Sequence, residues 1–255
     1  MNQSRKPKTK WIKFILWACL LLAVVIGGMF IYLDAKTYEP SDAAKLAMES
    51  DAQVQVTQVK DGYKFEPVRA DVLEPNVIFY PGGLVEPESY APFARQLAGV
   101  GHRVYLAKMP LNLAIFGQNR AEAFLAEHQG ESYIIGGHSL GGVFAARYAA
   151  EHGDKLAGVF FLASYADTAG SLEDLNLSAL QITASQDGVL NQEAWAESKV
   201  NLPEDTLYIS IEGGNHGQFG SYGRQKGDQV PTLNEEEQLE QVILAMEDWM
   251  QGLHP

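Results

Sequence analysis

A single serine lies between glycines in the stretch YIIGGHSLGG, residues 133–142. Ser139 follows an apolar run typical of a buried strand and precedes a segment with helical character, and Gly137 and Gly141 complete the pattern G-x-S-x-G. A serine at such a strand–turn–helix junction is exposed at the helix N-terminus, where the helix dipole favours developing negative charge. The pattern predicts a nucleophilic serine; the alternative is a serine that only caps the helix.

A serine hydroxyl becomes a good nucleophile only when a base removes its proton and a third group orients that base. At a junction of this kind the chain order is serine, acid, histidine. Of the six histidines, three precede Ser139, one ends the helix that follows it, and His254 lies in the extreme tail. His216, in the loop EGGNHGQFG, is therefore predicted as the base; the alternative is a polar loop histidine.

Two aspartates compete for the role of the orienting acid. Asp187, in ITASQDGVL, follows the penultimate predicted strand, and its Asp-Gly turn directs the carboxylate toward the edge that carries His216. Asp167 follows the strand that ends at Ala163 and is the rival. Glu212 lies just before the histidine and is interpreted as a local group. Asp187 is favoured, and a solvated turn aspartate remains the alternative for each.

Ester cleavage by a serine also needs N–H donors for the oxyanion that forms on the substrate. The backbone N–H of Leu140 follows the nucleophile and is predicted as one donor. The turn FYPGGLVEP, after the first strand of the alternating region, is predicted to supply the second. Gly83 is the preferred residue and Leu84 the runner-up; an ordinary strand-ending turn is the alternative.

The apolar segment MPLNLAIFG, residues 109–117, lies where a loop borders the predicted site. We expect Leu113 and Ile115, with Leu84, to form a wall for the acyl chain; the alternative is a loop packed on the core. About fifteen residues separate Ala163 from the next strand, so a large lid does not fit there. An open site of this kind favours small or medium acyl esters.

Beyond residue 53, short apolar runs alternate with segments of helical periodicity. A hairpin is predicted over 54–65, around the Asp61-Gly62 turn. The remaining predicted strands are 77–80, 103–107, 132–135, 158–163, 180–184 and 206–211. Helices are predicted around 90–97, 120–128, 140–151 and 192–199, and from Asn234 onward. This alternation predicts one α/β domain over 53–255, with a mostly parallel sheet and helices on both faces.

The N-terminal residues differ from the rest in composition. Residues 1–13 carry five basic and no acidic side chains, and residues 14–33 form an uncharged apolar run. At about 1.5 Å per residue, such a run covers a bilayer core of roughly 30 Å. We expect an uncleaved transmembrane anchor followed by a polar stalk at 34–52. The positive-inside rule predicts a single-pass membrane protein with a cytoplasmic N-terminus and an extracellular catalytic domain. The alternative is a cleaved signal peptide.

Charge and composition exclude several classes of function. The chain carries 19 basic and 32 acidic residues. Because five of the basic residues lie in residues 1–13, the rest of the chain has 14 basic against 32 acidic residues. A nucleic-acid interface, which needs clustered Lys and Arg, is not expected. The histidines have no metal-site spacing, and no phosphate-binding glycine loop occurs, so neither a metal nor a cofactor is predicted. The only cysteine, Cys19, lies in the apolar run and is interpreted as apolar filler.

Four motifs together resemble those of the α/β-hydrolase superfamily. YPGGLVEPESYAPFARQLA, GGHSLGG, SQDG and GGNHGQFG occur in the family's order over about residues 75–250, and they are most similar to the small fold-5 branch related to dienelactone hydrolases. The resemblance implies the α/β-hydrolase fold, the triad Ser139, Asp187 and His216, and oxyanion donors at Leu140 and Gly83. Dienelactone hydrolases use a cysteine nucleophile, so their substrate is not carried over. Pro81-Gly82 replaces the usual His-Gly of the oxyanion turn.

These features predict a membrane-anchored serine esterase of lipase-like type that acts on a small-molecule acyl ester through an acyl-enzyme. An acyltransferase with the same triad and a catalytically silent surface-binding module are the alternatives. A transferase needs a site that admits an acceptor and excludes water. The silent module is opposed by the presence of all three triad residues.

Overall fold

The computed structural model describes residues 8–68 and 71–253, which form two compact units that divide between Thr37 and Tyr38. The first unit contains one helix, α1 (Lys8–Asp34), whose segment Lys13–Asp34 has a mean hydropathy of 2.7. Among the described residues, this is the one helix long and apolar enough to cross a membrane, a property that anchors and signal sequences share. The first seven residues of the predicted cytoplasmic segment, and His254, lie outside the described residues.

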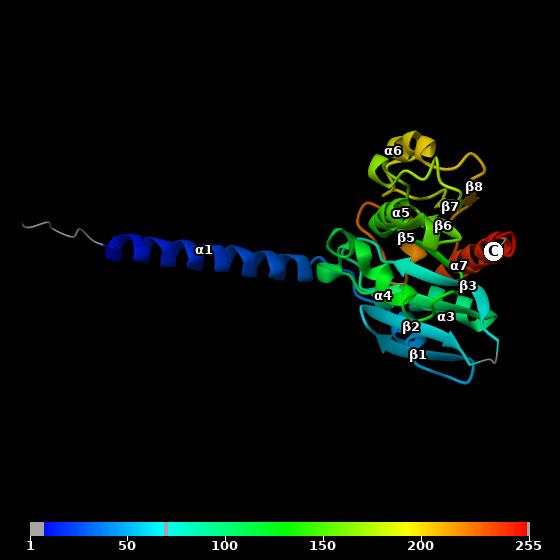
Figure 1. Cartoon of the computed structure of the whole chain (residues 1–255), viewed down its shortest axis with the longest axis horizontal. Coiled ribbons are helices and arrows are strands. Elements are labelled where there is room, and N and C mark those ends of the chain that lie inside the picture. The colour runs from blue at the N-terminus through cyan, green and yellow to red at the C-terminus, as the bar shows by residue number, and fades with distance from the viewer. Residues whose placement is uncertain (1–7, 69–70, 254–255) are drawn as a thin grey trace, which may run out of the picture. The chain divides into compact units, whose positions relative to one another are not determined.

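The second unit is built on one eight-stranded sheet (Figure 1). The strands lie in the order β1-β2-β4-β3-β5-β6-β7-β8, and the pairs that involve β2 are antiparallel while all others are parallel. Their bounds are β1 (Val54–Val59), β2 (Gly62–Pro67), β3 (Leu73–Tyr80), β4 (His102–Ala107), β5 (Tyr133–His138), β6 (Gly158–Leu162), β7 (Ser178–Ala184) and β8 (Leu207–Ile211). The predicted mostly parallel sheet is confirmed.

Helices cover both faces of this sheet, as predicted. Their bounds are α2 (Asp42–Ala47), α3 (Ala91–Val100), α4 (Ala121–Leu125), α5 (Leu140–His152), α6 (Gln192–Glu197) and α7 (Glu235–Gln251). Successive strand residues point to opposite faces, so Ile134 packs in the core beneath α3 and α7 whereas Ile135 packs in the core beneath α5. Asn234 caps α7 in a capping box with Glu237, which explains why this helix begins where the sequence predicts.

The segment expected as a stalk, residues 34–52, divides at the boundary between the units. Tyr38 forms a parallel bridge with Val85, and its N–H donates to the Leu84 carbonyl at 2.7 Å. The Ser41 hydroxyl contacts that of Ser221 at 2.6 Å. From Tyr38 onward this segment therefore belongs to the same compact unit as the sheet.

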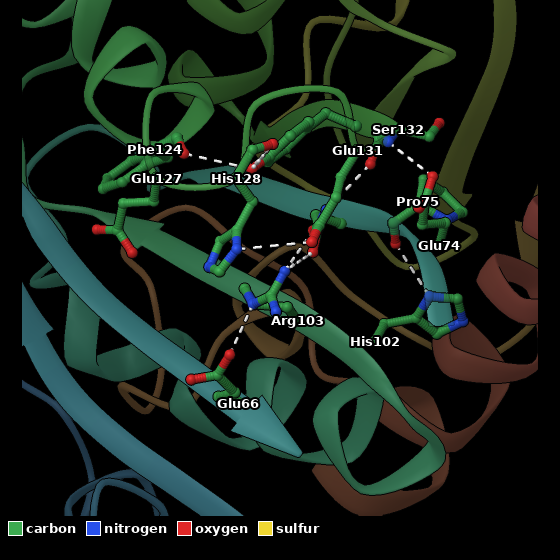
Figure 2. Close-up of polar contacts among 12 residues, drawn as sticks. Glu66, Glu74, Pro75, His102, Arg103, Phe124, Glu127, His128, Glu131 and Ser132 are labelled. Atoms are coloured by element: carbon green, nitrogen blue, oxygen red, sulfur yellow. Dashed lines mark hydrogen bonds and ion pairs between the residues drawn. The ribbon is translucent and has the colours of Figure 1, made fainter. Parts of the chain in front are cut away.

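A charged network lies at the amino ends of the parallel strands, opposite the edge predicted to carry the site (Figure 2). The Arg103 guanidinium contacts the carboxylates of Glu66 at 2.9 Å and Glu131 at 2.5 Å, and it donates to Asn76 Oδ1 at 2.8 Å. Arg103 is buried, so its charge requires these partners. The network joins β2, β3, β4 and the segment before β5, and we interpret it as structural.

Candidate active site

The carboxyl end of β5 turns sharply into α5 at Ser139. Ser139 has φ 50° and ψ −124°, a left-handed conformation that is strained for a residue with a side chain. Its N–H donates to the Leu162 carbonyl at 3.0 Å, which fixes the turn to the end of β6. A Cβ on Gly137 would lie 2.3 Å from the Tyr80 carbonyl oxygen, so glycine is required there. The strand and helix thus hold the serine at the sheet edge in one conformation.

A histidine and a carboxylate form a buried pair at the same edge. His216 Nδ1 lies 2.8 Å from Asp187 Oδ2, and Asp187 Oδ1 accepts hydrogen bonds from the N–H groups of Val189 and Leu190, each at 2.8 Å. Since a carboxylate accepts, Nδ1 carries the proton and Nε2 has its lone pair free. His216 Nε2 is buried and makes no hydrogen bond within residues 8–68 and 71–253. The imidazole is therefore able to receive a proton at Nε2.

Ser139 and His216 line the same cavity, which has a volume of about 240 Å³. Its other lining residues are apolar or uncharged: Leu140, Val143, Ala163, Ser164, Tyr165, Val189, Leu190 and Asn191. No lysine, arginine, aspartate or glutamate lines it among the residues described. Nor does the described part of the chain contain a cluster of three or more His, Cys, Asp or Glu that could hold a metal ion.

The turn after β3 presents one unpaired N–H beside the serine. The Gly82 N–H donates to the Tyr90 hydroxyl at 3.0 Å, and the Leu84 N–H donates to the Asn112 carbonyl at 2.7 Å. The N–H groups of Gly83 and Leu140 donate to no other described residue. A Cβ on Gly83 would lie 3.1 Å from Leu140 Cδ2, so the two residues are adjacent. Leu84, the predicted runner-up donor, has its N–H engaged elsewhere.

The rival carboxylates lie in other surroundings. Asp167 accepts from Arg147 Nε at 3.1 and 3.2 Å and from the Gly170 N–H at 3.0 Å. Glu212 is exposed. The structure therefore brings Asp187, and neither Asp167 nor Glu212, into contact with His216.

The predicted acyl-chain wall differs from the observed lining. Leu84, Leu113 and Ile115 are absent from the residues that line the 240 Å³ cavity. Leu113 lies beside the turn that contains Gly83, with its Cδ2 3.7 Å from the position of a Cβ on Gly83. Ile115 is 57% exposed. Apolar sequence alone did not distinguish the side of the loop that faces the turn from the side that faces solvent.

Two buried residues that the sequence analysis did not single out connect parts of this site. The Tyr90 hydroxyl lies 2.8 Å from His138 Nδ1, and the ring centroid of His138 lies 4.4 Å from that of His216. Burial, together with the neighbouring His216 imidazole, holds the pKa of His138 well below 6.5. Proximity of His138 to Ser139 in sequence was the available signal; Tyr90 had none.

A third such residue is Asp228, which connects the two loops that carry the buried pair. Asp228 Oδ2 accepts from the Gly217 N–H at 2.8 Å, and Oδ1 accepts from the Gly188 N–H at 3.1 Å. These glycines directly follow His216 and Asp187. The Asp228 carboxylate is buried and thus fixes both loops from one point.

Comparison with known proteins agrees with this architecture. Residues 76–240 match the model of the Alpha/beta hydrolase family. No curated protein matches the sequence. Among solved structures, a dienelactone hydrolase from Anabaena variabilis has a TM-score of 0.59 at 15% identity, covering 80% of this chain and 100% of that one.

Two further structures are similar at comparable distance. An esterase from Mycobacterium tuberculosis has a TM-score of 0.54 at 14% identity, covering 80% of this chain and 95% of its own. A bacterial membrane phospholipase A has a TM-score of 0.56 at 15% identity, covering 93% of this chain and 98% of its own. At these identities the likeness establishes the fold. The family match, the strand order and the strand–turn–helix serine lead to one conclusion: this chain belongs to the alpha/beta hydrolase family.

Proposed function

We propose that this chain is a serine hydrolase that cleaves carboxylic esters, with Ser139 as nucleophile, His216 as general base and Asp187 as the orienting carboxylate. One observation carries the proposal. Asp187 binds one nitrogen of His216, while the other nitrogen is buried, unpaired within the described residues, and belongs to a side chain that lines the cavity of Ser139. A base of this kind supplies what a serine hydroxyl lacks.

The proposed reaction proceeds through an acyl-enzyme. Ser139 Oγ attacks the ester carbonyl carbon while its proton passes to His216 Nε2. The negative charge that forms on the carbonyl oxygen is stabilised by the N–H groups of Leu140 and Gly83, and each such donor contributes about 3–4 kcal/mol to lowering the barrier. The bond to the alcohol oxygen then breaks, and that oxygen takes the proton from Nε2. Water repeats the sequence and releases the carboxylic acid.

The cavity favours a small, neutral substrate. A volume of about 240 Å³ lies below the range of roughly 300–1,000 Å³ that is typical of pockets for drug-sized ligands. The lining carries no charged side chain among the described residues, so a charged acyl group would lose its solvation without gaining a partner. Short acyl esters are the class that we expect the protein to cleave.

We propose further that α1 anchors this hydrolase in a membrane. The apolar segment Lys13–Asp34 is long enough to span a bilayer, and Lys8, Lys10 and Lys13 lie at its N-terminal side. The positive-inside rule then assigns the N-terminus to the cytoplasm and the catalytic unit, from Tyr38 onward, to the outside.

The test uses the full chain in detergent, a fluorophosphonate probe and p-nitrophenyl esters. We expect labelling of Ser139 and hydrolysis of the acetate and butyrate esters, both abolished by Ser139→Ala. Ser171→Ala, outside the cavity, is the matched control and should retain both. Absence of labelling and hydrolysis in the folded wild-type chain would refute the proposal. Transfer of the acyl group to an added alcohol in preference to water would instead identify an acyltransferase.

A further inference from the structure

The hydroxyl of Tyr90 lies between the oxyanion turn and the serine turn. Tyr90 is fully buried, its oxygen accepts from the Gly82 N–H at 3.0 Å, and it lies 2.8 Å from His138 Nδ1. A tyrosine hydroxyl has a single proton. Because the oxygen already accepts from Gly82, that proton is available for His138 Nδ1. One hydroxyl therefore joins the turn that contains Gly83 to the residue that precedes Ser139.

The hydrogen bonds on either side of Gly83 restrict its orientation. Tyr90 holds the N–H of the Pro81–Gly82 peptide, and the Asn112 carbonyl holds the N–H of the Gly83–Leu84 peptide. The Gly82–Gly83 peptide, which carries the Gly83 N–H, is therefore held on both sides. The Gly83 N–H lies between these two engaged groups and donates to no described residue. A donor fixed before the reaction needs no reorganisation when the oxyanion forms.

We propose that Tyr90 is a positioning residue for ester cleavage: its hydroxyl fixes the Gly82 peptide and His138 together, so that the Gly83 N–H and the serine turn keep the geometry that stabilises the oxyanion. This inference rests on the proposed function and adds to it the residue that holds the second donor in place.

The packing around the hydroxyl is consistent with this role. A Cβ on Gly82 would lie 2.9 Å from Tyr90 Oη and 3.0 Å from His138 Nδ1, so glycine allows the close approach. The depressed pKa of His138, caused mainly by its burial, keeps the imidazole neutral and its Nδ1 able to accept. The Tyr90 ring packs on Phe79 at a centroid distance of 4.7 Å. Phenylalanine at position 90 would retain the ring contact and lose only the hydroxyl.

The Tyr80 hydroxyl offers a matched control, because the Tyr80 side chain packs in the core on the other face of the sheet from Tyr90. It is equally buried, its hydroxyl donates to the Gln118 carbonyl at 2.5 Å, and it accepts from the Ala121 N–H at 2.9 Å. Tyr80→Phe and Tyr90→Phe thus each remove one buried hydroxyl with two hydrogen bonds. A general loss of stability should lower the activity of both variants, whereas a loss of oxyanion geometry should lower the activity of Tyr90→Phe alone.

The experiment compares the two variants with the wild-type full chain in detergent. For Tyr90→Phe we expect kcat for p-nitrophenyl butyrate to fall about 10- to 100-fold and KM to stay within about twofold. This fall in kcat does not exceed the roughly 100- to 1,000-fold fall that follows complete removal of one oxyanion donor. The rate of phosphonylation of Ser139 should fall in parallel, because that reaction also builds negative charge on an oxygen at the site. Tyr80→Phe should keep kcat within about twofold, and both variants should show a similar fall in Tm.

Three results would overturn the role of Tyr90: equal losses of kcat in both variants, a rise in KM at constant kcat, or unchanged kinetics in Tyr90→Phe. If the wild-type chain is phosphonylated but does not cleave esters, the labelling rates alone decide the role of Tyr90 while the esterase proposal fails. If Ser139 is neither labelled nor active, both proposals fail. The two failures are therefore distinguishable.

Discussion

Asparagine at position 187 should stop proton transfer while leaving the shape of the site intact. Asp187 Oδ1 accepts the N–H groups of Val189 and Leu190, and these donors would orient the amide oxygen of an asparagine toward themselves. The amide NH₂ would then take the place of Oδ2 and point at His216 Nδ1. Since an NH₂ group donates, Nδ1 would have to accept, and the imidazole proton would move to Nε2. Nε2 could no longer receive the proton of Ser139.

The magnitude follows from this change of tautomer. A histidine with the wrong tautomer retains binding and the oxyanion donors but loses general-base catalysis, which lowers kcat about 10³- to 10⁴-fold. At about 1.36 kcal/mol per tenfold change, this is roughly 4–5.5 kcal/mol of transition-state stabilisation. KM should change by less than about threefold, because the cavity keeps its lining residues.

Hydrolysis of p-nitrophenyl butyrate, normalised to folded protein by thermal unfolding, measures this effect. Asp167→Asn is the matched control: it also replaces a carboxylate that accepts a backbone N–H, but it lies beside Arg147 and not His216. Its kcat should stay within about twofold of wild type. A folded Asp187→Asn variant with more than a tenth of wild-type kcat, or an inactive but folded Asp167→Asn variant, would refute the assignment of the acid.

Three further predictions concern groups around and away from the site. Asp228→Asn cannot accept from both loops that follow the buried pair, so kcat should fall about tenfold and the free energy of unfolding by about 1–3 kcal/mol, measured by kinetics and urea unfolding. Arg103→Met removes the buried cation from two partly exposed carboxylates, of which Glu66 keeps Lys64 at 3.3 Å, and should lower the free energy of unfolding by about 1–3 kcal/mol with kcat unchanged; unchanged stability would contradict this. Burial holds the pKa of His102 below 6.5, so the unfolded chain binds this proton more readily and stability should fall as the pH drops below about 6.5, by up to ~1.4 kcal/mol per pH unit. His102→Gln should reduce this fall in urea titrations at pH 7.5 and 5.5.

Local patterns in the sequence predicted much of the fold. Alternation of apolar residues and the Asp61-Gly62 turn indicated the β1–β2 hairpin, and the Asn234 cap indicated the start of α7. The chain order of serine, acid and histidine identified the residues that the structure brings to one edge, because all parallel strands end there. Each of these features could be predicted because it depends on residues close in sequence or on the topology of a parallel sheet.

Contacts between distant segments could not be predicted in the same way. Tyr38 pairs with Val85, although its own neighbourhood is polar and reads as a linker. Tyr90 lies 48 residues before the histidine that it contacts, and an isolated buried tyrosine is indistinguishable from ordinary core in the sequence. The Asp187-Gly188 turn already favoured Asp187 over Asp167, and the structure adds the 2.8 Å contact between Asp187 and His216. Apolar periodicity specifies the element, whereas the partner of a polar group depends on how the elements pack.

The final glycine of G-x-S-x-G, Gly141, is a case in which a short motif does indicate a contact between distant segments. A Cβ on Gly141 would lie 2.1 Å from the Tyr80 carbonyl oxygen and 2.4 Å from that of Pro81. These carbonyls immediately precede Gly82 and Gly83, so α5 touches the end of β3 next to the proposed second oxyanion donor. Any side chain at 141 would push the helix, and with it the Leu140 N–H, away from the Gly83 N–H. The glycine is therefore required for the distance between the two proposed donors as well as for the turn that exposes the serine.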